Sequence, residues 1–128
     1  MPEALLIDSD ILIDHLRKEQ NALDYIQQKI DDESHLFISV ISRIEILTGA
    51  RKGEEGTILS VFDILTSVDV DLAIADRAGD YMREFHKSHA LNIGDAVIAA
   101  TAKEMGMQLI TRNIKHYPMK DVEIARPY

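Results

Sequence analysis

Short, almost wholly apolar runs that alternate with helical patterns constrain the fold of this chain most strongly. Residues 4–7, 36–38 and 109–111 are runs of this kind, and polar residues follow the first two closely. Strands that are apolar throughout are covered on both faces, which is typical of parallel sheets with helical connections. The pattern therefore predicts an α/β fold, a three-layer α/β/α sandwich around a central, mainly parallel sheet.

The segments between these runs carry apolar residues at helical spacing. We expect helices over residues 11–30, 40–47, 58–65, 71–85 and 95–105, and further strands near 67–70 and 122–125. Ser39 or Ser42 can cap the second helix, and Asp71 the fourth. Two apolar stripes are expected to face the core: Val40, Ile41, Ile44 and Leu47, and then Leu72, Ala75, Ala78, Gly79, Met82 and Phe85. The last helix is apolar almost all round, so we expect it to be buried.

The length of the chain sets a limit on its organisation. Its 128 residues, 46% of them hydrophobic, suffice for one core, so we expect a single domain over residues 1–128. The sequence has no cysteine, which excludes disulfides and cysteine-ligated zinc. Its start, Met1-Pro2-Glu3, is not basic, and no uncharged run approaches the ~20 residues that span a bilayer. We therefore expect a cytoplasmic protein without a membrane segment.

Several acids fall where parallel strands are expected to end. Asp8 and Asp10 follow the first strand, Glu45 lies in the helix after the second, and Asp95 begins the buried helix. Ligands of open α/β sheets bind beyond the carboxyl ends of the strands, so these residues can converge at one edge, with Asn113 after the strand at 109–111. Clustered carboxylates favour Mg²⁺ or Mn²⁺, and such a site supports metal-assisted phosphoryl transfer.

Each acid also has a structural explanation. Asp8 and Asp10 can cap the first helix, and Ser42 with Glu45 fits a capping box. Asn92 with Asp95 fits the same geometry less well. From the residues alone, metal ligation and capping both remain open.

Four motifs together resemble one family, the PIN domains of the VapC toxin type. They are Asp8-Ser9-Asp10 within residues 5–14, Arg43-Ile44-Glu45 within 39–50, Gly94-Asp95-Ala96 within 92–102, and Thr111-Arg112-Asn113 within 109–117. Their order and spacing hold over essentially the whole chain.

The resemblance implies a Mg²⁺- or Mn²⁺-dependent endoribonuclease, the toxin of a toxin–antitoxin pair. Such a protein is usually a homodimer that a small antitoxin neutralises, and its RNA products carry 5′-phosphate and 3′-hydroxyl ends. Carried over by position, the metal-binding and catalytic acids are Asp8, Glu45 and Asp95. Where the family commonly has Asn or Ser this chain has Asp10, a further candidate ligand. The family's fourth carboxylate is absent, and Asn113 offers only an amide oxygen.

Basic residues near the same edge are candidates for RNA contacts: Arg43, Arg51, Lys52, Arg112 and Lys115, with Thr111 beside them. Scattered surface charge explains the basic residues nearly as well. The formal net charge of −8 argues against RNA binding by charge alone. If acids are metal ligands, bound cations place positive charge where the phosphate sits, so RNA affinity should depend on divalent metal.

Other functions remain to be weighed. The Asp8-Ser9-Asp10 segment also resembles the first motif of haloacid-dehalogenase-type phosphatases, although Leu12 stands where that family has Thr or Val. A non-catalytic PIN-like interaction module, with its acids serving as caps, is another alternative. His86 and His89 have a spacing that can hold zinc, but no third ligand is in register, so we expect surface histidines.

Overall fold

One parallel sheet organises the molecule. The computed structural model describes residues 3–128, so Met1 and Pro2 of the segment considered above lie outside the described residues. The elements are β1 (Ala4–Ile7), α1 (Ser9–Leu16), α2 (Gln20–Asp31), β2 (His35–Ser39), α3 (Val40–Thr48), α4 (Glu55–Ile64), β3 (Thr66–Val68), α5 (Leu72–His89), α6 (Ile93–Met105), β4 (Gln108–Ile110), the 3₁₀ helix η1 (Ile114–His116) and β5 (Ile124–Ala125). The strand order is β3-β2-β1-β4-β5, and every neighbouring pair is parallel. The predicted α/β class is confirmed.

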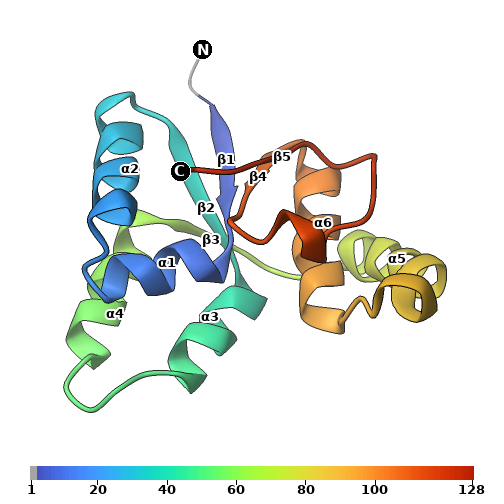
Figure 1. Ribbon diagram of the computed structural model, residues 1–128, viewed down its shortest axis with the longest axis horizontal. Helices are drawn as coiled ribbons and strands as arrows, with labels where there is room; N and C mark the ends of the chain where they lie inside the picture. Colours follow the sequence, from blue (N-terminus) through green and yellow to red (C-terminus); the bar gives the residue numbers. More distant parts are fainter. Residues whose placement is uncertain (1–2) are drawn as a thin grey trace.

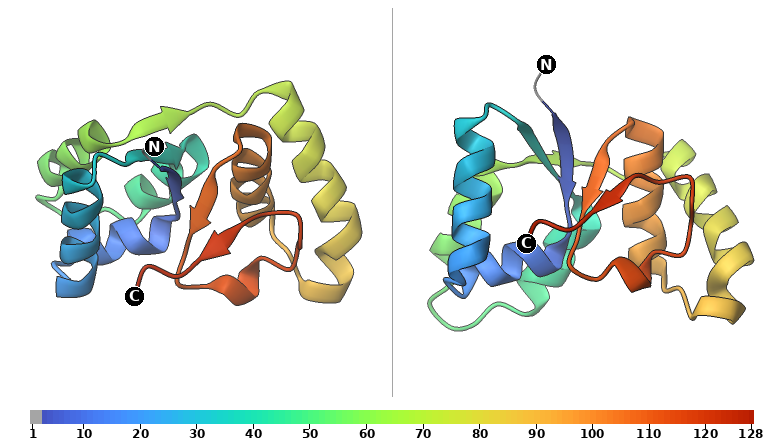
Figure 2. Two further views of the ribbon diagram at one scale, coloured as in Figure 1. Left: turned by 90° about the horizontal axis from the view of Figure 1, so that it is seen from above. Right: turned by 45° about the horizontal axis from the view of Figure 1, so that its top comes forward.

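Helices cover both faces of this sheet (Figures 1 and 2). The alternation of β1 shows why: Leu5 and Ile7 belong to a core with α1, α2 and α4, whereas Leu6 belongs to a core with α5 and α6. All three side chains are at most 1% exposed. A wholly apolar strand therefore fits here because neither face of β1 meets water.

Helix α6 is the buried helix that its composition predicts. Its residues Ala96–Ala102 are buried without interruption, in a core that also takes in side chains of the sheet and of α5. Gly106 ends it in the left-handed conformation, with φ 65°. The N-terminus of α6 lies near the carboxyl ends of the strands (Figure 1).

The continuous helix predicted from residue 11 to 30 is wrong. The chain instead forms α1 and α2, separated by a turn in which Lys18 has a φ of 61°. A straight helix of 20 residues would be about 30 Å long, whereas β1 and β2, with four and five residues, span only about half of that. The two shorter helices both pack in the core on one face of the sheet.

Two predicted apolar stripes are also displaced. In α3, Ile44 and Leu47 are 60% and 49% exposed, while Ser42 and Ile46 face the interior. In α5 the buried residues are Ile74, Ala78 and Tyr81, whereas Leu72 is 84% exposed. Ile41 of the first stripe and Ala78, Met82 and Phe85 of the second do pack in the core, so periodicity located both helices but only part of each packing face. Asp71 caps α5 as expected, since its Oδ1 accepts from the Ile74 amide at 2.9 Å.

No helix within residues 3–128 is long and apolar enough to cross a membrane.

Candidate active site

The topology brings acids from separate parts of the chain to the carboxyl edge of the sheet. In Figure 1 this is the lower edge, where β1 leads into α1, β2 leads into α3, and α6 begins. Asp8 lies directly after β1, Glu45 lies on α3, and Asp95 lies in the first turn of α6. Hydroxyl groups that contact Asp8 and Glu45, and Asp8 and Asp95, show that these three acids form one group.

Asp8 is at the centre of this group and is only 5% exposed. Its Oδ1 accepts the Ser9 amide at 2.7 Å and thereby caps α1, so the capping role considered from the sequence is present. Its Oδ2 accepts the Tyr117 hydroxyl at 2.7 Å. A nearly buried carboxylate with donors on both oxygens is held in a fixed orientation.

Two hydroxyl groups connect the three carboxylates. Ser9 Oγ lies 3.3 Å from Asp8 Oδ1 and 3.3 Å from Glu45 Oε1. Tyr117 Oη lies 2.7 Å from Asp8 Oδ2 and 3.4 Å from Asp95 Oδ1. The hydroxyls therefore stand between like charges that would otherwise face each other directly.

Burial and mutual repulsion shape the protonation of the group. Burial, followed by the charges of Asp8 and Asp95, raises the pKa of the Glu45 carboxyl. Burial and then the charge of Asp8 raise the pKa of the Asp95 carboxyl. Burial and the adjacent carboxylates raise the pKa of the Tyr117 phenol, which therefore stays a protonated donor. The site is short of positive charge.

The contacts of Asp95 and Glu45 bear on the capping boxes considered from the sequence. Asn92 Oδ1 accepts the Asp95 amide at 2.8 Å, and Asn92 Nδ2 lies 3.2 Å from Asp95 Oδ2. Asn92 therefore caps α6, but the Asp95 carboxylate accepts from the Asn92 side-chain amide and not, as in a capping box, from its backbone amide. The Ser42–Glu45 box does not form, because Ser39 caps α3 through its contact with the Ile41 amide at 3.1 Å. Glu45 is left to face Asp8.

Asp10 has a different set of partners. Its Oδ2 accepts from the Arg112 amide at 2.9 Å, from Asn113 Nδ2 at 3.1 Å and from Thr111 Oγ1 at 3.4 Å. Its Oδ1 accepts the Ile11 amide at 2.8 Å. Burial and the charge of Asp8 raise the pKa of Asp10. These bonds tie the turn after β4 to α1, which supports a structural role for Asp10 and for the Asn113 amide.

The predicted RNA-contact arginines are engaged elsewhere. The Arg112 guanidinium pairs with Asp14, which also accepts the Tyr128 hydroxyl at 2.7 Å. Arg43 donates to Ser67 Oγ at 3.1 Å, and its guanidinium carbon lies 4.2 Å from the centre of the Phe62 ring. Neither side chain contacts the three carboxylates.

The geometry and the chemistry of the three acids differ in how well they fit a divalent cation. Within residues 3–128, no three His, Cys, Asp or Glu side chains stand in a geometry that would hold a metal ion as they are. The donor chemistry nevertheless fits Mg²⁺ or Mn²⁺, because three hard carboxylates lie close enough to repel one another. The side chains that separate them carry neutral hydroxyls and no positive charge. His86 and His89 are exposed, as expected.

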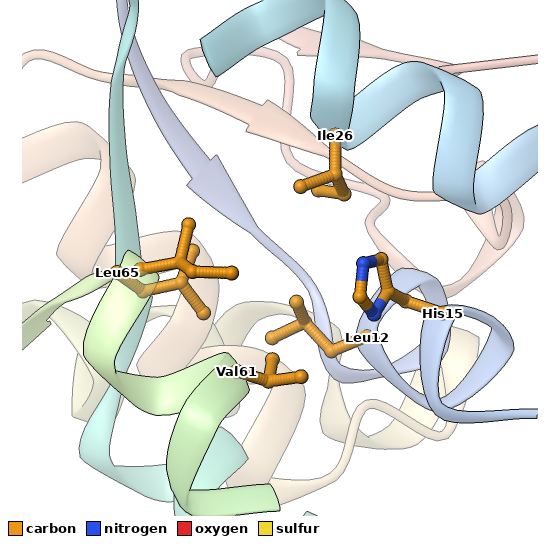
Figure 3. A pocket seen from close by; sticks show the side chains of 6 residues that line it. Leu12, His15, Ile26, Val61 and Leu65 are labelled. Atoms are coloured by element: carbon orange, nitrogen blue, oxygen red, sulfur yellow. The ribbon is translucent and has the colours of Figure 1, made fainter. Parts of the chain in front are cut away.

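An apolar pocket elsewhere is not the site. It lies between α1, α2 and α4 and is lined by Leu12, His15, Ile26, Val61, Ile64 and Leu65 (Figure 3). It has no room for a water molecule, and none of the predicted site residues lines it. His15 Nδ1 has no hydrogen-bond partner in the described part of the chain, and burial lowers the pKa of this imidazole.

Sequence patterns did not single out Ser9, Tyr117 or His116 as site residues. Tyr117 joins the group through a bond between residues 109 positions apart, and His116 Nδ1 lies 3.7 Å from Asp95 Oδ2. Both follow the strand-end motif at Thr111, and that neighbourhood is the only signal that the sequence offers for them.

Comparisons with known proteins bear on the family and the fold of this chain. A family model described as "PIN domain" matches residues 5–122. Ribonuclease VapC10 of Mycobacterium tuberculosis is 40% identical over 119 residues, which cover 90% of this chain and 86% of that protein. Ribonuclease VapC19 of the same organism is 33% identical over 115 residues, which cover 89% and 92%.

Solved structures give the same result for the fold. A toxin–antitoxin complex from Klebsiella pneumoniae contains a chain with 28% identity and a TM-score of 0.78, covering 97% of this chain and 98% of that one. VapBC-1 from nontypeable Haemophilus influenzae has a TM-score of 0.80 at 18% identity, covering 97% and 98%, which bears on the fold alone.

Proposed function

Because this chain belongs to the PIN domain family, we propose that it is a divalent-metal-dependent endoribonuclease, the toxin of a toxin–antitoxin pair. The observation that carries the proposal is the convergence of Asp8, Glu45 and Asp95 at the carboxyl edge of the sheet. The similarity to Ribonuclease VapC10 and Ribonuclease VapC19 supports the choice of RNA as substrate. We propose that the protein acts in the cytoplasm, and an RNA substrate supports that location.

In this proposal Asp8, Glu45 and Asp95 hold Mg²⁺ or Mn²⁺, directly or through water. When bound, the cation supplies Lewis-acid chemistry: it polarises the scissile phosphate and lowers the pKa of an attacking water. Asp8 is the fixed ligand, since both of its oxygens are already oriented by donors. Glu45 is exposed and its carboxylate has one contact, to Ser9, so it can adjust as substrate binds.

The turn after β4 forms the wall of the site. Thr111 is fully buried, and its hydroxyl accepts the Asn113 amide at 3.0 Å. Together with Asp10 it fixes the strand end beside Asp8. We propose that Thr111, Asp10 and Asn113 position the substrate edge of the site, and that Arg112 contacts the RNA backbone only if it leaves Asp14.

The proposal is tested by RNA cleavage with Mg²⁺. Asp8→Asn and Asp95→Asn should each lose most activity, and a chelator should abolish it in the wild type. Asp76→Asn is the matched control, because Asp76 is exposed on α5. Equal cleavage by all variants, or cleavage in the presence of chelator, would refute the proposal.

One observation favours a second candidate, a non-catalytic PIN-like interaction module: no three ligand side chains of residues 3–128 are set for direct chelation. Calorimetric titration with Mn²⁺ separates the two. An enzyme should show a site that Glu45→Gln or Asp95→Asn removes, and a scaffold should show none. The phosphatase alternative loses its support, since the family match is to PIN domains.

The partner of such a toxin is a cognate antitoxin, and we propose that this chain is neutralised by one. Matching structures include toxin–antitoxin complexes. Ile44 and Leu47 on α3 and Leu59 on α4 are 49% to 60% exposed, so apolar surface is available for an antitoxin or for a second copy in a homodimer. Light scattering of the isolated chain would test the homodimer.

A further inference from the structure

Tyr117 contacts the carboxylate site from the protein interior. Its side chain is 4% exposed and packs in the core that α6 and β4 share. Its hydroxyl reaches Asp8, which follows β1, and Asp95, which lies in the first turn of α6. A single group of the core therefore touches both acids.

The phenol uses only one oxygen of each acid. The other oxygen of Asp8 contacts Ser9, and the other oxygen of Asp95 faces Asn92 and His116. Each carboxylate thus keeps lone pairs for a cation while the phenol fixes its orientation. A hydroxyl can do this without adding charge to the core, and its one hydrogen serves chiefly Asp8 at 2.7 Å, with Asp95 farther away at 3.4 Å.

We propose that Tyr117 is a positioning residue for the divalent cation: its hydroxyl keeps Asp8 and Asp95 beside each other, from where both can close on the metal. The inference rests on the proposed function and adds to it the group that preorganises the ligands. Partners of this kind, one shell behind the ligands, commonly control metal affinity by about 10- to 100-fold. A purely structural tyrosine would affect folding without affecting metal affinity.

The test compares Tyr117→Phe with Tyr81→Phe by calorimetric Mn²⁺ titration of the full chain. Tyr81 is a matched control, since it is also 4% exposed and donates to Asp121 at 3.0 Å, away from the three carboxylates. Tyr117→Phe keeps the ring that fills the core and should weaken Mn²⁺ binding by about 10-fold or more. Tyr81→Phe should bind as the wild type does.

The outcomes separate this inference from the proposed function. A wild type that binds no Mn²⁺ overturns both. A wild type that binds Mn²⁺, with Tyr117→Phe folded and within twofold of its affinity, overturns only the role of Tyr117.

A second measurement does not require the phenylalanine variant to fold. With 3-fluorotyrosine at position 117, the ¹⁹F resonance should shift when Mg²⁺ saturates the site, because the hydroxyl donates to two ligands. A resonance that stays unchanged would overturn the inference.

Discussion

Replacing Glu45 with glutamine should stabilise the metal-free protein while it removes a proposed metal ligand. Burial and the charges of Asp8 and Asp95 raise the pKa of Glu45 above its unfolded value. The folded state therefore binds more protons than the unfolded state between the two pKa values, and the free energy of unfolding falls as pH rises through that window. At neutral pH the ionised carboxylate is a net cost, which glutamine removes at nearly constant size.

The size of this stabilisation can be worked out from the distances of the Asp8 and Glu45 carboxylates to the Ser9 hydroxyl. Asp8 Oδ1 and Glu45 Oε1 each lie 3.3 Å from Ser9 Oγ, so these two oxygens are no farther apart than twice that distance. At about 6.6 Å, two unit charges repel by about 0.6 kcal/mol in the dielectric of water and about 2.5 kcal/mol at an effective dielectric of 20. Glu45 is exposed as a residue although its carboxylate is partly buried against Ser9, so screening by water favours the lower value. About 0.6 kcal/mol corresponds to a rise in Tm of roughly 2–3 °C for a domain of this size.

Thermal melts at pH 7 provide the assay. In chelator, Glu45→Gln should melt slightly above the wild type; on addition of Mn²⁺ the wild type should gain stability and the variant should gain little. Glu84→Gln, on the exposed surface of α5, should behave as the wild type in both conditions. The reasoning is refuted if Glu45→Gln melts lower in chelator, or if Mn²⁺ stabilises it as much as the wild type.

Two further predictions concern protonation and RNA binding. Burial lowers the pKa of His15, so the unfolded state binds its proton more readily, and the free energy of unfolding should fall as pH drops below about 6.5. His15→Leu should flatten that decline in urea titrations between pH 7 and pH 5, and an unchanged slope would contradict the assignment. Binding of non-cleavable phosphorothioate RNA, followed by fluorescence anisotropy, should be at least about tenfold tighter with Mg²⁺ than with chelator; equal affinities would show that protein cations suffice.

The parts of the fold that could be predicted are those in which burial is nearly complete. Residues 4–7 and 96–102 are almost wholly apolar, and the structure buries nearly all of them between layers. The carboxyl edge follows from the same argument, because parallel strands all end there. The break at Lys18 could not be predicted, since it depends on how long the sheet is rather than on local sequence.

The contacts within the site were less accessible to sequence patterns. Tyr117 sits in a segment whose aromatic and apolar residues also serve the core, and periodicity does not report a contact with Asp8. For Ile44 and Leu47 the helical spacing predicted burial, but both side chains face outward on α3. Pattern locates an element, and only packing decides which side of it is buried.

The net negative charge of the chain affects how RNA can approach the carboxylate edge. Arg112 is paired with Asp14, and Arg43 is stacked on Phe62. The formal net charge is −8, and the three carboxylates at the sheet edge are separated from one another by hydroxyls, not by basic side chains. A phosphate approaching that edge would meet repulsion from the protein itself, so the positive charge that RNA requires has to be acquired with the metal. Metal binding and RNA binding are therefore expected to be coupled at one site, with neutral hydroxyls keeping the acids assembled beforehand.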